Sequence, residues 1–220
     1  HAQMLTSPRR HLTLVIVPTV ALAIEQALRA KEVMQRAGQD HGGSYVWHSG
    51  LGPEARSEMK ARLAAGEQRV LFCSPEAATG GLLLQLFSLA QRGLLGAVMV
   101  DEAHLIDQWG AEFRPEFQLL APLVKSLMAT SPDPIKVVLL SATFSQSTQD
   151  TLKALFASSR ADAVIDINGS FLRPEPAWFV SEAADYDDYL VQVEAAIARL
   201  PAPMIIYTTE VEQAKFWHQY

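Results

Sequence analysis

The segment AVMVDEAHLIDQWGAEFRPEF, residues 97–117, carries the strongest structural signal in this chain. It begins with an apolar run, 97–100, that has no polar alternation and ends in two acids, Asp101 and Glu102. A run of this kind predicts a strand buried on both faces, as in the middle of a parallel sheet. Ligands of open α/β sheets bind just beyond the carboxyl ends of such strands. We therefore expect an α/β fold in which both acids stand at a ligand-binding edge.

The two acids suit the hydrolysis of a phosphate chain. At that edge Asp101 would hold Mg²⁺, directly or through water, and Glu102 would orient and deprotonate the attacking water. Taken alone, Asp101 is better explained as a helix N-cap, because Asp often caps the element that follows a strand. Its combination with Glu102, His104 and the aromatic residues that follow favours the catalytic interpretation.

Asp101-Glu102-Ala103-His104 is similar to the DEAH form of the nucleotide-hydrolysis motif of superfamily 2 helicases, and 108–117 resembles the aromatic-rich loop of the RecQ family. The resemblance implies a RecA-like parallel sheet of the P-loop NTPase type, flanked by helices. It also implies ATP and Mg²⁺ as cofactors, and single-stranded DNA and duplex/single-strand junctions as partners. On this basis we expect part of an ATP-dependent DNA helicase.

Further turns resemble the motifs with which this family contacts a nucleic-acid backbone or links that contact to hydrolysis. Hydroxyl and amide contacts to phosphates position a strand without reading its sequence. Each hydroxyl could instead cap its own turn or helix, and the sequence leaves both interpretations open. The resemblance assigns backbone contacts to Pro18, Thr19, Ser49, Gly50, Ser74 and Pro75, and a link to the hydrolysis site to Ser141 and Thr143.

The aromatic loop is expected to sense single-stranded DNA. Trp109 and Phe113 can stack on any base at about 1–3 kcal/mol per base, and Arg114 can pair with a phosphate or stack as a flat cation. The loop starts a few residues after Glu102, so a shift of the loop has a short covalent route to the hydrolysis site. The alternative is that the aromatic residues fill the groove under the helix that begins at Pro115, and Phe117 fits that alternative better than Phe113 does.

The remaining pattern predicts a first RecA-like domain over 1–168, a linker over 169–176 and the truncated start of a second RecA-like domain over 177–220. Glycine, serine and proline mark the linker. Strands are predicted at 12–17, 44–48, 68–73, 97–100, 136–140, 163–167, 177–180 and 204–207, and helices at 20–38, 53–65, 82–91, 115–128, 145–158, 183–200 and from 210 onward.

Composition fits a folded protein whose summed charge is not basic. The 220 residues are 49% hydrophobic and 19% charged, which argues against disorder, and the net charge of −6 predicts no whole-chain attraction to nucleic acid. The single cysteine, Cys73, fits a reducing compartment, and we favour a bacterial cytoplasm, in association with the nucleoid, over a nucleus. The basic pair before 11–23 resembles a signal peptide, but Pro18 interrupts the stretch, which reads better as a strand and a helix start. No stretch is long enough to span a membrane, and the sequence identifies no protein partner.

No G-x-x-x-x-G-K-[ST] loop occurs in the 220 residues, although the intact family holds the phosphates of ATP with that loop. The family's upstream adenine-reading segment and later arginine finger are not found either. We therefore expect a fragment, incomplete at the N-terminus of its first domain, that does not hydrolyse ATP alone. Two alternatives remain: a non-hydrolysing nucleic-acid-binding or scaffold protein that lost its phosphate loop, and a superfamily 2 translocase in DNA restriction or defence.

Overall fold

The computed structural model describes residues 11–40, 42–108, 115–157, 164–169, 177, 179–201 and 203–219. The chain divides into two compact units, His1–Ser170 and Phe171–Tyr220. The boundary between the units falls inside the predicted linker, of which only Gly169 is described. The domain bounds predicted from the sequence therefore stay a prediction.

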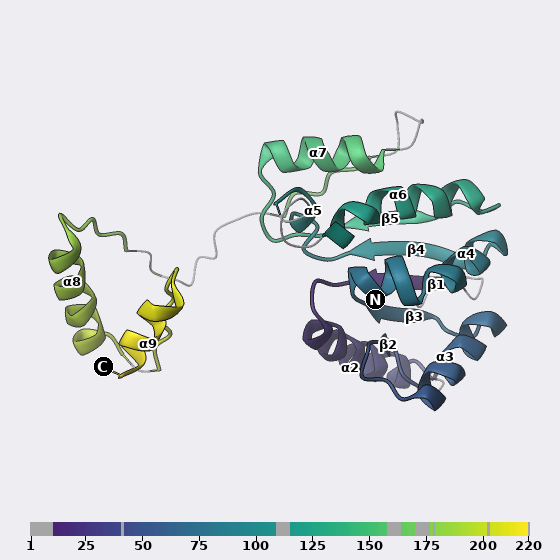
Figure 1. Cartoon of the computed structure of the whole chain (residues 1–220), viewed down its shortest axis with the longest axis horizontal. Helices are drawn as coiled ribbons and strands as arrows, with labels where there is room; N and C mark the ends of the chain where they lie inside the picture. The colour runs from purple at the N-terminus through teal and green to yellow at the C-terminus, as the bar shows by residue number, and fades with distance from the viewer. Residues whose placement is uncertain are drawn as a thin grey trace. The chain divides into compact units, whose positions relative to one another are not determined.

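A five-stranded sheet forms the centre of the first unit (Figure 1). Its order is β2-β3-β1-β4-β5, and each neighbouring pair is parallel, as the apolar runs predicted. In a fully parallel sheet, all carboxyl ends lie at one edge, so the turns that follow the strands are neighbours in space. The strands are β1 (Leu12–Ile16), β2 (Val46–Trp47), β3 (Val70–Cys73), β4 (Leu95–Val100) and β5 (Lys136–Leu139).

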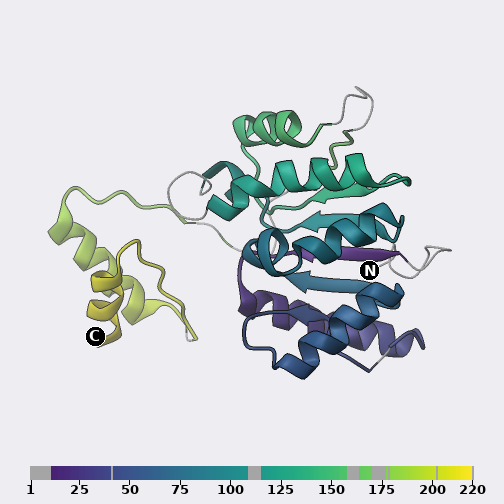
Figure 2. The ribbon, with the colours of Figure 1, turned by 45° about the vertical axis from the view of Figure 1, so that its right-hand side comes forward.

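Helices cover both faces of this sheet (Figures 1 and 2). Alternate residues of β1 point to opposite faces, as the pleat requires: Leu14 packs in one apolar core and Val15 in the other. The larger core joins the sheet to α3 (Pro53–Ala65), α4 (Leu83–Gln91) and α6 (Pro115–Thr130), and the smaller core joins it to α2 (Val20–Arg36). The layers confirm the predicted α/β fold class.

Local sequence signals set the helix ends. The Thr19 side chain caps α2 by accepting a hydrogen bond from the Leu22 amide at 3.2 Å. Pro53 occupies the first turn of α3, where its missing N–H costs nothing, and Gly66 ends that helix with φ of +70°, a conformation that favours glycine. The predicted bounds of α3 agree with the structure.

Two short elements were not predicted, and one predicted helix is shorter than expected. The predicted helix at 82–91 is preceded by a π-helix, η1 (Ala77–Gly81), in which the Thr79 hydroxyl donates to the Pro75 carbonyl at 2.9 Å. A one-turn helix, α5 (Leu105–Gln108), follows the DEAH residues. The helix after β5 is α7 (Gln146–Phe156), slightly shorter than predicted.

Three predicted strands are wrong wherever the structure describes them. Residues 164–167, 177, 179–180 and 204–207 have no strand assignment, although their composition is apolar. A strand needs a hydrogen-bonded neighbour, and none of these segments has one among the described residues. The second unit shows two helices in its described part, α8 (Tyr186–Arg199) and α9 (Val211–Gln219).

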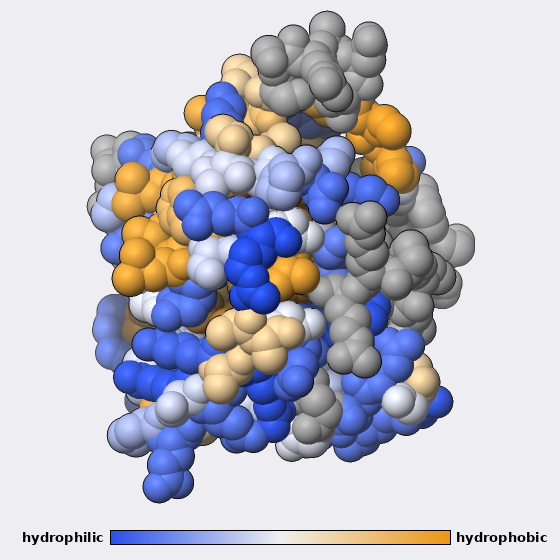
Figure 3. Space-filling view, turned by 90° about the vertical axis from the view of Figure 1, so that its right-hand side faces the viewer, coloured by the Kyte–Doolittle hydropathy of each residue, from blue (hydrophilic) through white to orange (hydrophobic). Residues whose placement is uncertain are grey.

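The edge of the sheet at β5 differs in character from the face where the strands begin. The edge strand β5 has a neighbour on one side only within the described residues, and Leu140, directly after it, is 46% exposed. On the face of the first unit where the strands begin, many side chains in view are hydrophilic, with separate apolar patches among them (Figure 3). No helix in the described part of the chain is long and apolar enough to cross a membrane.

Candidate active site

The sheet brings the predicted turns to one edge. Backbone hydrogen bonds fix the centre of that edge: the Asp101 amide donates to the Ile16 carbonyl at 2.9 Å, and the Leu140 amide donates to the Val100 carbonyl at 2.9 Å. The turns that follow β1, β3, β4 and β5 therefore meet there, as expected for parallel strands. These turns hold Pro18 and Thr19, Ser74 and Pro75, Asp101 and Glu102, and Ser141 and Thr143.

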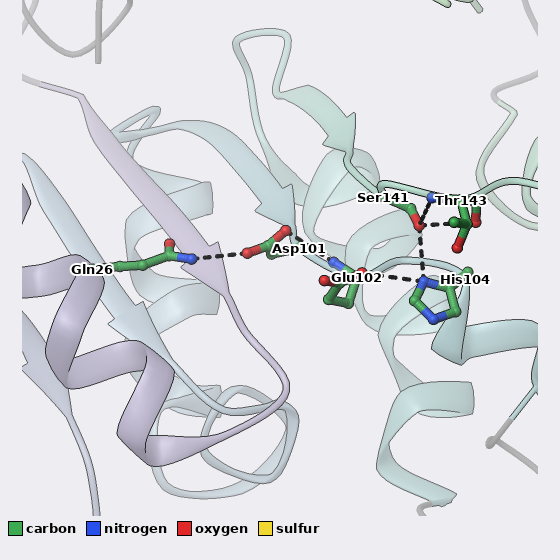
Figure 4. Close-up of polar contacts among 6 residues, drawn as sticks. All are labelled: Gln26, Asp101, Glu102, His104, Ser141 and Thr143. Carbon is green, nitrogen blue, oxygen red and sulfur yellow. Dashed lines mark hydrogen bonds and ion pairs between the residues drawn. The ribbon is translucent and has the colours of Figure 1, made fainter. Parts of the chain in front are cut away.

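The carboxylate of Asp101 is held from two directions (Figure 4). Its Oδ2 accepts a hydrogen bond from Gln26 Nε2 at 2.8 Å, and its Oδ1 accepts one from the Glu102 amide at 3.0 Å. An N-cap would accept from the second or third following amide, but the Ala103 amide donates instead to the Leu140 carbonyl at 2.8 Å. The half-buried carboxylate is thus oriented by a neutral amide.

Glu102 has an unusual backbone. Its φ is +51°, which makes it the one non-glycine residue with positive φ in the described part of the chain. That conformation costs an L-residue roughly 1–2 kcal/mol and is found most often where function requires it. Contacts on both sides hold it: the carbonyl accepts from the Leu105 amide at 2.9 Å, and Oε2 lies 3.3 Å from His104 Nδ1. The side chain remains 39% exposed and can meet a water molecule.

His104 joins the turn after β4 to the turn after β5. Its Nδ1 lies 2.8 Å from Ser141 Oγ. Ser141 Oγ also donates to the Thr143 carbonyl at 3.0 Å and accepts from the Thr143 amide at 3.1 Å. A serine hydroxyl has one proton, so Ser141 accepts from Nδ1 when it donates to the Thr143 carbonyl, and the tautomer of His104 sets the direction of the Ser141–His104 bond. Thr143 takes part in this network through its backbone.

The turns predicted to bind a nucleic-acid backbone are already engaged locally. Thr19 caps α2 but is exposed, and the Ser74 hydroxyl is buried and accepts from a backbone amide three residues on at 3.4 Å. After β2, the Ser49 carbonyl accepts from Arg56, and the Gly50 amide donates to His48 Nδ1 at 3.1 Å. A capping hydroxyl accepts through its oxygen and can still donate its proton to a phosphate, so the structure leaves both roles open.

Trp109, Phe113 and Arg114 lie outside the described residues. The described flanks are α5, which ends at Gln108, and α6, which begins at Pro115. Phe117, on the first turn of α6, is completely buried in the larger core. The alternative of core packing is therefore the right one for Phe117.

Three side chains at or near the site were missed from the sequence: Gln26, Asp107 and Thr148. Gln26 lies on the face of α2 that buries Ala23, Ala27 and Ala30, so a polar residue on an apolar face was the available signal. Thr148 Oγ1 donates to Asp107 Oδ2 at 2.9 Å. The two residues are 41 positions apart, and no local sequence pattern predicts a contact at that separation.

The acids fit a magnesium ion that is shared with a phosphate chain. The described residues hold no cluster of three or more histidine, cysteine or acidic side chains that would enclose a metal ion. Mg²⁺ commonly takes one or two carboxylates and completes its shell with water and substrate phosphates. The Asp101 carboxyl group, oriented at the sheet edge by Gln26, suits that arrangement.

Comparisons with known proteins identify relatives of this chain. The model of the DEAD/DEAH box helicase family matches residues 2–151. The RecQ-like DNA helicase blm-1 of Caenorhabditis elegans is 32% identical over 136 residues, 60% of this chain and 13% of that protein. The ATP-dependent DNA helicase RecQ of Haemophilus influenzae is 30% identical over 172 residues, 78% of this chain and 25% of that protein.

A second bacterial relative and a solved structure agree with these matches. The ATP-dependent DNA helicase RecQ of Pasteurella multocida is 32% identical over 74% of this chain and 23% of that protein. The chain thus spans about a quarter of the bacterial relatives or less. The DUF1998 helicase MrfA, solved bound to DNA, superposes with a TM-score of 0.53 at 15% identity over 70% of this chain and 21% of that one, which supports the fold.

Replacing Gln26 by Leu should destabilise the chain by about 1–2 kcal/mol, because a half-buried carboxylate loses a hydrogen-bond donor. Urea unfolding of the 220-residue chain measures this change. Gln35 offers a matched control, since its Nε2 donates to Asp40 Oδ2 at 3.1 Å on the exposed side of the same helix. Gln35→Leu should cost about 0.5 kcal/mol or less. Equal effects of the two variants would show that the Gln26 contact does not hold Asp101.

Proposed function

This chain belongs to the DEAD/DEAH box helicase family, and we propose that the protein carrying it is an ATP-dependent DNA helicase of the RecQ type. In this proposal, hydrolysis of ATP drives movement along single-stranded DNA and unwinding at duplex/single-strand junctions. The observation that carries it is the position of His104, whose Nδ1 lies 3.3 Å from Glu102 Oε2 and 2.8 Å from Ser141 Oγ and so joins the acids to the next turn of the same sheet edge.

Hydrolysis of ATP at this site would require a bound magnesium ion and a water molecule held in position for attack. Magnesium bound with ATP neutralises the charge that develops on the phosphates. Asp101 would hold that ion, and Gln26 would keep the carboxylate turned toward it. Glu102 would accept a proton from the water that attacks the γ-phosphorus, with ADP and phosphate as products. His104 would hold the Glu102 carboxylate through Nδ1.

Nucleic acid would lie across the neighbouring turns. Pro18 and Thr19 with Ser74 and Pro75 would contact backbone phosphates, and the segment of Ser49 and Gly50 would extend that track. Such contacts hold a strand in place and carry no sequence information. Trp109 and Phe113 would stack on bases, and Arg114 would pair with a phosphate. The network through Ser141 and Thr143 would then report the presence of the strand to Glu102.

Hydrolysis by the 220 residues alone is not expected. They contain no Gly-rich Lys-Ser/Thr loop, and backbone amides of that loop supply most of the grip on ATP phosphates. Without that grip, Asp101 and Glu102 have no γ-phosphate in reach.

The relatives are named as DNA helicases, and we propose that this protein acts on DNA in a bacterial cytoplasm.

Glu102→Gln in the full-length protein should lower the ATPase rate at least about a hundredfold, since general-base catalysis contributes roughly 10²–10⁴. Phosphate release with saturating single-stranded DNA measures it, and DNA binding should persist. Glu54→Gln, an exposed change in the first turn of α3, is the control and should keep the wild-type rate. A Glu102→Gln protein with wild-type turnover, or Glu102-dependent turnover by the 220 residues alone, contradicts the assignment.

Trp109→Ala should uncouple DNA binding from hydrolysis, because stacking on a base is worth about 1–3 kcal/mol and the alanine side chain has no ring. The ratio of ATPase rates with and without single-stranded DNA should fall, while the rate without DNA stays near wild type. Trp109→Phe keeps a ring and should retain most of the stimulation. Unchanged stimulation in Trp109→Ala would refute the role of the loop.

DNA should stimulate hydrolysis more than RNA of the same sequence. Titration of the full-length protein with single-stranded DNA, single-stranded RNA and duplex DNA compares the three. Stronger stimulation by RNA or by duplex DNA without a free end would favour a translocase of another superfamily 2 branch.

A further inference from the structure

A second contact joins the DEAH segment to the segment after β5. The first contact is that of His104 with Ser141. Three residues beyond His104 and seven beyond Ser141, Thr148 Oγ1 donates to Asp107 Oδ2 at 2.9 Å. Asp107 lies in α5 and Thr148 in the first turn of α7, so the bond connects two helices that follow neighbouring strands.

The hydroxyl of Thr148 has a defined direction. Thr148 is 2% exposed, and its Oγ1 lies 2.9 Å from Ser145 Oγ. The Ser145 side chain also accepts from the Thr148 amide at 3.1 Å and so caps α7. A carboxylate only accepts hydrogen bonds, so the Thr148 proton goes to Asp107 and the Ser145 proton can go to Thr148. Hydrogen bonds in such a chain, with an anion at its end, strengthen one another.

Asp107 also supplies a charge that α7 lacks. The first turn of α7 contains no acidic residue. A carboxylate near the N-terminus of a helix is favourable because it faces the positive end of the helix dipole. Asp107 delivers that carboxylate from another helix, so the position of α7 depends on the position of α5 as well as on its own sequence.

The position of Asp107 in the sequence points to a role for its hydrogen bond with Thr148. Asp107 lies two residues before Trp109, at the entrance to the segment 109–114. Its amide donates to the His104 carbonyl at 3.2 Å. The hydrogen bond therefore connects α5, which precedes the segment 109–114 in the sequence, to α7, which follows the turn of Ser141.

We propose that Asp107 and Thr148 are positioning residues, and that their hydrogen bond makes α5 and the segment 141–148 move together when single-stranded DNA binds. This inference rests on the proposed function, because it takes the segment 109–114 as the part that senses DNA. Neither residue touches nucleotide or DNA in this account. Each acts through the Glu102–His104–Ser141 network.

Thr148→Val tests the proposal, because valine has nearly the same shape and no hydroxyl. In the full-length protein, the ATPase rate without DNA should stay within about twofold of wild type, while stimulation by saturating single-stranded DNA falls about five- to tenfold, the size expected for loss of coupling. Thr148→Ser keeps the hydroxyl and should restore stimulation. Asp107→Ala should match Thr148→Val, and the double variant should be no worse than either.

Thr130→Val is the control, because the Thr130 hydroxyl donates to the Ser126 carbonyl at 2.7 Å on the exposed end of α6, away from the network. It should keep wild-type stimulation. Three results would overturn the proposal. Thr148→Val could keep wild-type stimulation, or it could lower the ATPase rates with and without DNA equally. Thr148→Ser could also fail to restore stimulation.

A second measurement separates this proposal from the proposed function. If the wild-type protein shows no stimulation by single-stranded DNA, the proposed function fails before any variant is made. Hydrogen exchange on the full-length protein then measures directly whether the hydrogen bond holds α5 and α7 together. Thr148→Val should speed exchange of amides at 105–107 and at 145–148 together, whereas unchanged exchange at 105–107 would show that the two helices are not tied.

Discussion

The parallel pairing of β4 with β1 on one side and β5 on the other is the constraint on which the site depends. It aligns three strand ends, so that residues separated by 75 positions, Gln26 and Asp101, meet at 2.8 Å. The amides of Asp101 and Leu140 extend the ladders past the last strand residues and fix the start of both turns. Without that register, the acids would not share an edge with the hydroxyl turns.

Side-chain hydrogen bonds then connect the turns and helices that meet at this edge of the sheet. Gln26 ties α2 to Asp101, His104 ties the DEAH turn to Ser141, and Thr148 ties α7 to Asp107. The partner of Asp101 from α2 and the partner of Asp107 from α7 are neutral groups, a side-chain amide and a hydroxyl. The positive φ of Glu102 fits the same picture, because a strained residue persists only where its neighbours hold it.

The sequence predicted the strands of the sheet better than it predicted the side-chain hydrogen bonds at the edge of the sheet. Unbroken apolar runs located the strands of the first unit, and the residues directly after them lie at one edge because parallel strands leave no other choice. The contacts of Gln26 and Thr148 arise only after folding, since each partner lies more than 40 positions away. The apolar segment 204–207 shows the opposite failure: its composition is that of a strand, but a strand forms only beside another strand. Local pattern cannot show whether that neighbour is present.

A crystal structure of the full-length protein with Mg²⁺, a non-hydrolysable ATP analogue and a single-stranded oligonucleotide tests the central claim most directly. The account predicts the metal within coordination distance of Asp101, about 2.1 Å for a direct ligand or one water further out, with the γ-phosphate facing Glu102. It also predicts the strand across the turns of Thr19 and Ser74, on the same edge of the sheet. A nucleotide bound away from Asp101 and Glu102, or a strand held on another face, would contradict it.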